Sequence, residues 1–240
     1  MTADRWTQAV REQLSLGRIL PLGDASAGAW IAESAARAVL RGAAYEVAGV
    51  RPGVLRLALA DPEHVYDPVV PPPPSALPPG PLRLTAEFAA GAAQPLPETA
   101  ARLRTALATA AATRLGLTVA EVDLRVTDLL DEETEAEPVR PPEPPDAREA
   151  TGADEARAAE AALAVPGVAR LTGTLGALGR AVHIDGGTDT GDGPSRRHVR
   201  LELALRADHR SVDVAREVRA RVGEALWDHP TVAVLVTAVG

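Results

Sequence analysis

A pattern that occurs twice along this chain of 240 residues constrains its fold more than any other feature of the sequence. Residues 31–50 join an alanine-rich segment to Val47-Ala48-Gly49-Val50, and residues 153–168 join another to Val165-Pro166-Gly167-Val168. Each copy continues with residues typical of a strand, a hairpin, a strand, a helix and a strand. An internal repeat indicates that one unit is built twice. We therefore predict an α+β fold of two tandem αββαβ units, each a small three-stranded sheet with helices on one face.

The spacing of matching positions sets the predicted domain boundaries. Val47 matches Val165, 118 positions later, whereas Val126 matches Val236, 110 positions later. The offset shrinks in small steps at expected loops, where changes in length are tolerated. The prediction is an N-terminal helical segment (1–28), a first repeat (29–131), an acidic Pro-rich linker (132–152) and a second repeat (153–240).

Hydrophobic periodicity predicts the elements within the repeats. In the first repeat we expect a helix from Ile31, strands Val54–Ala60 and Leu82–Ala90 on either side of a long proline-rich loop, and a second helix. The last strand, Val119–Leu130, alternates with Val122, Leu124 and Val126 inward and Glu121, Asp123 and Arg125 outward. The strands expected in the second repeat are Val168–Thr172, Ala181–Ile184, Val199–Leu205 and Val232–Val239.

The net charge of −8 is concentrated in and around the linker. Residues 131–160 contain eleven acids and three arginines, so their sum equals the charge of the whole chain. The stretch at 135–145, with its five prolines, lacks the apolar residues needed to form a core and is expected to be extended and disordered. A solvated spacer is the favoured interpretation, and an acidic docking tail is the alternative.

The N-terminal segment carries an apolar stripe but no targeting signal. Trp6, Val10 and Leu14 recur at helical spacing, which predicts either an interfacial membrane contact or a helix folded back on the first repeat. The chain has no signal peptide pattern, no apolar run of about 18 residues and no lipidation motif. We expect a cytoplasmic protein, with peripheral membrane association as an alternative.

Several residue groups could carry chemistry, but none forms a specific motif. Gly173, Gly176 and Gly179 precede a strand and not the helix N-terminus that phosphate binding requires. The acids Asp185, Asp189 and Asp192 lack the closing glutamate of a calcium loop. His183 and Asp185 share a strand face near His198 and His209, but a zinc site needs three or four converging ligands. We predict no catalytic residues, no metal and no cofactor.

The arginines between Arg196 and Arg221 suggest a nucleic-acid-binding module as an alternative function. Eight arginines fall in this region, but no aromatic residue lies among them for base stacking. Salt bridges within the protein or with the acidic linker are the favoured interpretation. A nucleic-acid partner is therefore not expected.

The repeats resemble the alkaline shock protein family, the Gls-type envelope stress response proteins. The similarity lies in Val47, Gly49 and Val50 with Val39–Ala44 before them, in Pro95–Ala100, and in Val119–Val126. In the second repeat it lies in Val165, Pro166, Gly167 and Val168, in Ser211–Val218, and in Val232–Val239. This chain departs from the family in having two copies and in having Ala48 where proline is usual.

The resemblance implies a non-enzymatic protein that gathers near the membrane through a membrane-anchored protein partner. Together with the missing catalytic motif, it leads us to expect an envelope-stress or scaffold protein that acts through protein–protein assembly, with homo-oligomerisation among its modes. A metal-dependent or small-ligand enzyme using His183 and Asp185 is the remaining alternative.

Overall fold

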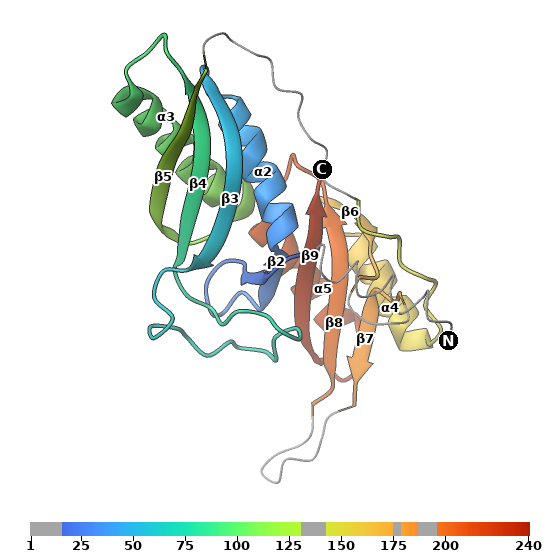
Figure 1. The fold of residues 1–240 in the computed structure, drawn as a ribbon. Coiled ribbons are helices and arrows are strands. Elements are labelled where there is room, and N and C mark those ends of the chain that lie inside the picture. Colours follow the sequence, from blue (N-terminus) through green and yellow to red (C-terminus); the bar gives the residue numbers. More distant parts are fainter. Residues whose placement is uncertain (1–15, 131–142, 175–178, 187–195) are drawn as a thin grey trace, which may run out of the picture.

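The protein is a mixed α+β structure in a computed structural model that describes residues 16–130, 143–174, 179–186 and 196–240 (Figure 1). Within these ranges it has four α-helices and two β-sheets. The helices are α2 (Glu33–Tyr45), α3 (Leu96–Ala110), which continues into a π-helical turn over Ala111–Leu115, α4 (Ala153–Leu163) and α5 (Ser211–Ala225). The mixed α+β class is confirmed.

The first sheet contains β3 (Val50–Leu59), β4 (Leu82–Gly91) and β5 (Val119–Leu130) in that order. β3 is antiparallel to β4, and β4 is parallel to β5. Leu55, Leu57 and Phe88 are buried towards α2 and α3, which cover one face (Figure 1). The opposite face carries charged side chains, so this sheet matches the expected alternation.

The second sheet has six strands, so the prediction of a three-stranded sheet there is wrong. Its order is β1-β2-β9-β8-β6, with β7 also paired to β8. The strands are β1 (Ile19–Pro21), β2 (Ala29–Ala32), β6 (Val168–Leu171), β7 (Val182–Asp185), β8 (His198–Leu205) and β9 (Thr231–Val239). β9 runs parallel to both β2 and β8.

Two strands of this sheet, β1 and β2, were not among the predicted elements, and they lie where the N-terminal helical segment and the start of the first helix were expected. Ile31 was expected to begin the first helix, but it lies in β2, and α2 begins at Glu33. All four residues of β2 are buried, and a short, fully buried strand has no alternation to distinguish it from a helix. The predicted helical segment 1–28 is therefore wrong over β1, and the boundary at residue 29 falls between two paired strands.

The proline-rich loop at 60–81 packs against the second sheet on the face away from the helices. Val70 joins Ile19, Trp30, Ala233 and Leu235 in a small buried cluster. The Trp30 Nε1 donates a hydrogen bond of 3.3 Å to the Leu77 carbonyl. Val70 and Pro73 are buried three residues apart, which is the period of a polyproline II helix. This loop is therefore part of the core packing.

The end of the linker is also ordered, which corrects the expectation of a wholly disordered spacer. Within 143–152, the Ala147 N–H donates to the Leu171 carbonyl at 3.2 Å and the Arg148 N–H donates to the Gly179 carbonyl at 2.8 Å. Arg170 forms an ion pair of 2.7 Å with Asp146. Extended, proline-rich chain can pair with an exposed strand when its few N–H groups face that strand. Residues 132–142 lie outside the described residues.

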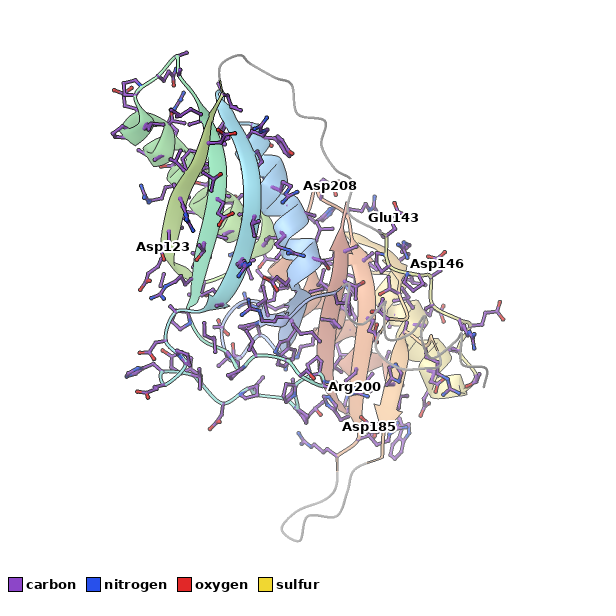
Figure 2. The ribbon with its side chains drawn as sticks, viewed as in Figure 1. Asp123, Glu143, Asp146, Asp185, Arg200 and Asp208 are labelled. Carbon is purple, nitrogen blue, oxygen red and sulfur yellow. The ribbon has the colours of Figure 1, made fainter. Side chains whose placement is uncertain are left out.

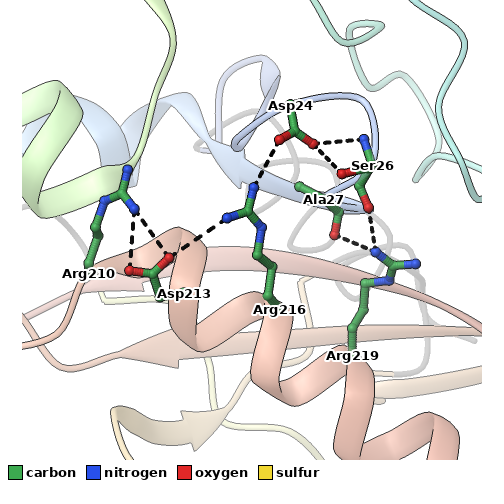
Figure 3. Close-up of polar contacts among 7 residues, drawn as sticks. All are labelled: Asp24, Ser26, Ala27, Arg210, Asp213, Arg216 and Arg219. Carbon is green, nitrogen blue, oxygen red and sulfur yellow. Dashed lines mark hydrogen bonds and ion pairs between the residues drawn. The ribbon is translucent and has the colours of Figure 1, made fainter.

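A single hydrophobic cluster joins the two sheets. It includes Leu40 of α2, Leu57 of β3 and Val234 of β9. The helix α5 also contacts the loop before β2, where Arg216 pairs with Asp24 at 3.1 Å and Arg219 donates to the Ser26 and Ala27 carbonyls (Figure 3). Residues far apart in the sequence therefore pack in one core.

Candidate assembly interface

The strand β5 is a free sheet edge. It pairs with β4 on one side, and no other segment of the described residues forms backbone hydrogen bonds with its second side. In the six-stranded sheet, Ala76 forms a bridge to Ile19 of β1, and Ala147 hydrogen-bonds to Leu171 of β6, so these two outer strands are partly covered. β3 and β7 are also outer strands, but both are shorter than β5. A long unpaired edge is a ready site for another strand.

The exposed face of β5 is charged. Arg83 of β4 bonds to Glu121 at 2.6 Å and lies 3.7 Å from Asp123. The hydrogen bond with Glu121 raises the pKa of Arg83. Arg125 lies 4.0 Å from Glu87, at the limit of an ion pair. The pattern of outward charges on β5 is therefore as expected, and Asp123 and Arg125 are only loosely held.

The apolar side of β5 is incompletely covered. Val122 and Leu124 are half-buried against the core, whereas Val126 is 39% exposed and Leu129 is 56% exposed. The Arg104 side chain of α3 donates to the Val122 carbonyl at 3.3 Å, which shows that this carbonyl points away from β4. An added strand would cover Val126 and replace Arg104 at that carbonyl.

A second polar cluster lies on β7 and β8, far from β5: Figure 2 labels Asp185 and Arg200 there, with Asp123 on the other sheet. Asp185 pairs in register with His198, and His183 with Arg200, so the four share one sheet face. His198 Nδ1 lies 2.8 Å from the Thr231 hydroxyl, and His183 Nε2 lies 3.1 Å from the Arg180 carbonyl. His209 is separate, beside Asp208.

Burial determines the charge of these histidines. It lowers the pKa of both His183 and His198, and the nearby Arg200 guanidinium lowers both further. Asp185 acts in the opposite direction on both. Within the described ranges no three histidine, cysteine or acidic side chains are grouped as metal ligands. The cluster is thus a buried and a half-buried histidine, both with lowered pKa, beside an arginine–aspartate contact.

Glu202, on the same face, was not identified from the sequence. It is only 2% exposed, and its carboxylate accepts hydrogen bonds from the Thr174 N–H at 2.7 Å and the Thr174 hydroxyl at 2.6 Å. These hydrogen bonds therefore anchor the segment that connects β6 and β7 to the strand β8. The signal available in the sequence was an acidic residue between two apolar neighbours, Leu201 and Leu203, in a predicted strand.

The two predicted turn motifs have the same geometry. Gly49 and Gly167 both have positive φ, at +75° and +95°. In each turn the last valine donates to the first, Val50 to Val47 and Val168 to Val165, at 3.2 Å. Pro166 lies in the second turn, between its valine and glycine, at the place of Ala48 in the first. Both motifs therefore form the same kind of turn between a helix and a strand.

Some of the remaining predicted site residues lie outside the described ranges, and most of the others form contacts within the protein. Trp6, Val10, Leu14, Gly176, Asp189 and Asp192 lie outside the described residues. Six of the eight arginines in 196–221 bond or pair with other described residues, namely Arg197, Arg200, Arg210, Arg216, Arg219 and Arg221. Arg197 contacts both Asp228 and Asp154, at 2.6 and 2.7 Å. This network links helices and loops of the protein itself.

The sequence did not reveal that β5 would be an edge strand. Its alternation was predictable, but an edge is defined by which strands pair, and pairing depends on distant parts of the chain.

In the described part of the chain no helix has the length and apolarity needed to span a bilayer. No protein-family model, curated protein or solved structure matches this chain.

Proposed function

We propose that this protein is a non-enzymatic assembly protein that binds a protein partner through the free edge of β5. The observation that carries the proposal is the unpaired side of this strand over Val119–Leu130, which is longer than any other outer strand of the two sheets in the described residues. Strand addition at an exposed edge uses main-chain hydrogen bonds for affinity and alternating side chains for specificity. The resemblance to envelope stress proteins suggests a membrane-anchored partner and a scaffold role.

A duplicated αββαβ unit is part of this proposal. It is supported by the matching turns at Gly49 and Gly167, whose carbonyls each accept a 2.8 Å hydrogen bond, from the Gly91 and Arg206 N–H groups. The β3-β4-β5 order has its counterpart in the second copy: β6 and β7 both pair antiparallel with β8, as β3 does with β4, and β8 pairs parallel with β9, as β4 does with β5. In the second copy the edge equivalent to β5 is β9, and β2 occupies it. That intramolecular pairing is an example of the strand addition proposed for β5.

The polar residues of the described chain support binding better than catalysis or nucleic-acid recognition. Glu202 binds the loop residue Thr174, buried His198 contacts Thr231, and half-buried His183 contacts the Arg180 carbonyl. Arg210, Arg216 and Arg219 are held by Asp213, Asp24 and the Ser26–Ala27 carbonyls (Figure 3). Phosphate binding would have to displace these contacts, so the arginine region has less support as an interface.

A pair of valine substitutions tests the β5 interface. Val126→Lys places a charge on the edge strand β5, whereas Val54→Lys makes the same change on β3, the opposite edge of the same sheet, where the valine is similarly exposed at 44%. Native host cells expressing each full-length variant would be fractionated, and membrane-associated protein and bound partner quantified. We expect Val126→Lys to reduce both at least tenfold, because edge lysines oppose strand addition, and Val54→Lys to behave as the wild type.

The controls decide what a negative result means. Both variants must retain the wild-type thermal midpoint, which shows that neither lysine disturbs the sheet. If Val126→Lys keeps the full amount of partner, β5 is not the interface and the proposal is wrong. If both variants lose the partner equally, the effect is not specific to the edge of β5, and the proposal is wrong as well.

A further inference from the structure

We propose that β5 pairs with β5 of a second copy, in antiparallel orientation, about a two-fold axis that passes through Leu124. This inference rests on the proposed function, because it names the partner of the same free edge. In a two-fold pair each residue opposes the residue equally far from the centre on the other strand. Around Leu124, Asp123 therefore opposes Arg125 of the second copy, and Arg125 opposes Asp123 of the second copy.

The sequence of β5 favours this centre over its neighbours. A centre at Asp123 would place the two Asp123 side chains opposite each other, and a centre at Arg125 would do the same with the two Arg125 side chains. Like charges directly opposite on a sheet are destabilising, whereas opposite charges stabilise. Only the centre at Leu124 converts both residues into ion pairs, and it does so twice because the arrangement is symmetric.

The charged side chains are available for these contacts. Asp123 is 62% exposed and Arg125 is 76% exposed. Within the chain their ion-pair distances are 3.7 Å to Arg83 and 4.0 Å to Glu87, both longer than the 2.6 Å between Arg83 and Glu121. Pairing with a second copy therefore competes only with weak contacts.

The apolar side of the strand fits the same register. Val122 and Leu124 lie on the side of β5 that faces the core, and Val126 follows at the same spacing, 39% exposed. In the proposed pair Val126 opposes Val122 of the second copy, and the two Leu124 side chains meet at the axis. The uncovered part of Val126 is then buried by an apolar neighbour. The result is one continuous six-stranded sheet made from two three-stranded sheets.

The hydrogen-bonding groups also agree with a centre at Leu124. The Val122 carbonyl points away from β4, since Arg104 of α3 donates to it. Because backbone groups alternate sides along a strand, the N–H and carbonyl of Leu124 and Val126 point the same way. The antiparallel pairs Leu124–Leu124 and Val122–Val126 are therefore the hydrogen-bonded ones. Arg104 is exposed and can release the carbonyl to the incoming strand.

Charge reversal tests the register through oligomeric state. Sedimentation velocity on the full-length protein should show a dimer for the wild type. Asp123→Arg places an arginine opposite Arg125 of the second copy at both contacts, and Arg125→Asp places an aspartate opposite Asp123. Each substitution should weaken dimerisation at least tenfold. An equimolar mixture of these two variants restores both opposite-charge pairs, so heterodimers should form. The double variant Asp123→Arg/Arg125→Asp should dimerise like the wild type.

Cysteine cross-linking locates the axis independently. The chain has no cysteine, so a single substitution gives an unambiguous product. Leu124→Cys lies on the proposed axis, where the two Cα atoms would be about 5.5 Å apart, within disulfide range. We expect a covalent dimer after mild oxidation for Leu124→Cys and none for Val54→Cys on β3.

The outcomes separate this inference from the proposed function. A wild type that stays monomeric up to about 1 mM overturns the self-pairing. So does a dimer that is unaffected by both single charge reversals, or one that the mixture fails to restore. If such a monomer still recovers a partner that Val126→Lys abolishes, the β5 interface stands and only its occupant is different. If the wild type dimerises as expected but no membrane-associated partner depends on β5, the self-pairing stands alone.

Discussion

At the scale of single residues, Gly49 and Gly167 hold equivalent turns but have different surroundings. A Cβ added at Gly49 would meet nothing closer than the Gly91 N at 4.0 Å, whereas one at Gly167 would lie 2.7 Å from Val214 Cγ2 and 2.8 Å from His209 Cγ. Both have positive φ, which disfavours any side chain. The two alanine substitutions therefore separate backbone strain from steric overlap.

We predict that Gly49→Ala lowers the free energy of unfolding by about 1 kcal/mol, from the left-handed conformation alone. Gly167→Ala should cost about 2–4 kcal/mol, because overpacking against Val214 is added to the same strain. Urea unfolding followed by circular dichroism measures both. Equal costs at the two positions would contradict the assignment of Val214 and His209 as the neighbours that require glycine.

The buried histidines predict a loss of stability on mild acidification. The pKa values of His183 and His198 are lowered from the ordinary 6.5, chiefly by burial. Well above pH 6.5 both are neutral in the folded and unfolded chain and do not affect the free energy of unfolding. As the pH falls through 6.5 the unfolded chain takes up protons that the folded protein resists, so unfolding becomes easier. Asp228, whose pKa is lowered from 3.8 by Arg197, acts only at lower pH.

The free energy of unfolding should therefore fall between pH 7.5 and pH 5.5, and the double variant His183→Gln/His198→Gln should show a flatter profile over that interval. His64→Gln is the matched control, because His64 lies exposed in the loop beside Asp61. An unchanged slope in the double variant would show that other groups cause the pH dependence.

At the scale of elements, the proline-rich loop behaves as part of the core. Val70 is 4% exposed under this loop, and the adjacent Val69 is 56% exposed. We expect Val70→Ala to destabilise the protein by about 1–2 kcal/mol through the lost packing against Trp30, and Val69→Ala to change stability by less than about 0.5 kcal/mol. Thermal unfolding of the two variants provides the comparison. Similar effects would contradict the packing of this loop on the sheet.

The sequence predicts some elements well and others poorly, for identifiable reasons. The alternation in Val119–Leu130 gave β5 with its full bounds, because a strand with one solvated face has a clear period of two. β2 was missed because Ala29–Ala32 are buried throughout and precede a helix without a break. The linker residues 145–148 were missed because their order depends on β6 and not on their composition.

The candidate interface was predictable only in part. The outward positions of Asp123 and Arg125 follow from local alternation. Their significance depends on β5 being unpaired on one side, and the equivalent edge in the other sheet is covered by β2. The local sequence of β5 or β9 does not indicate which of these two edges the hairpin of β1 and β2 will pair with.

At the scale of the whole molecule, the shared core predicts cooperative unfolding. Leu57 and Val234 belong to one buried cluster, and α2 lies between the first sheet and β9. We expect calorimetry of the full-length protein to show a single transition with equal calorimetric and van't Hoff enthalpies. A fragment of residues 153–240 should lack a cooperative transition, because it would expose the side of β9 that β2 covers.

Two transitions in the intact chain, or a fragment that melts as sharply as the full protein, would show that the units are energetically independent. A mixture of this fragment with residues 16–130 provides the control. If the two pieces pack as described, combining them should restore a cooperative transition without the covalent linker.

The pairing of β2 with β9 has a consequence for biosynthesis. Ala29–Ile31 align with Val234–Val236, which are translated 205 residues later. The hairpin of β1 and β2 therefore leaves the ribosome long before the strand that it pairs with. Until β9 is made, β2 and β8 both lack the strand that pairs with them. A chain stalled before Thr231 therefore exposes two unpaired strand edges to chaperones and proteases. Folding of the six-stranded sheet thus has to wait until β9 has been synthesised.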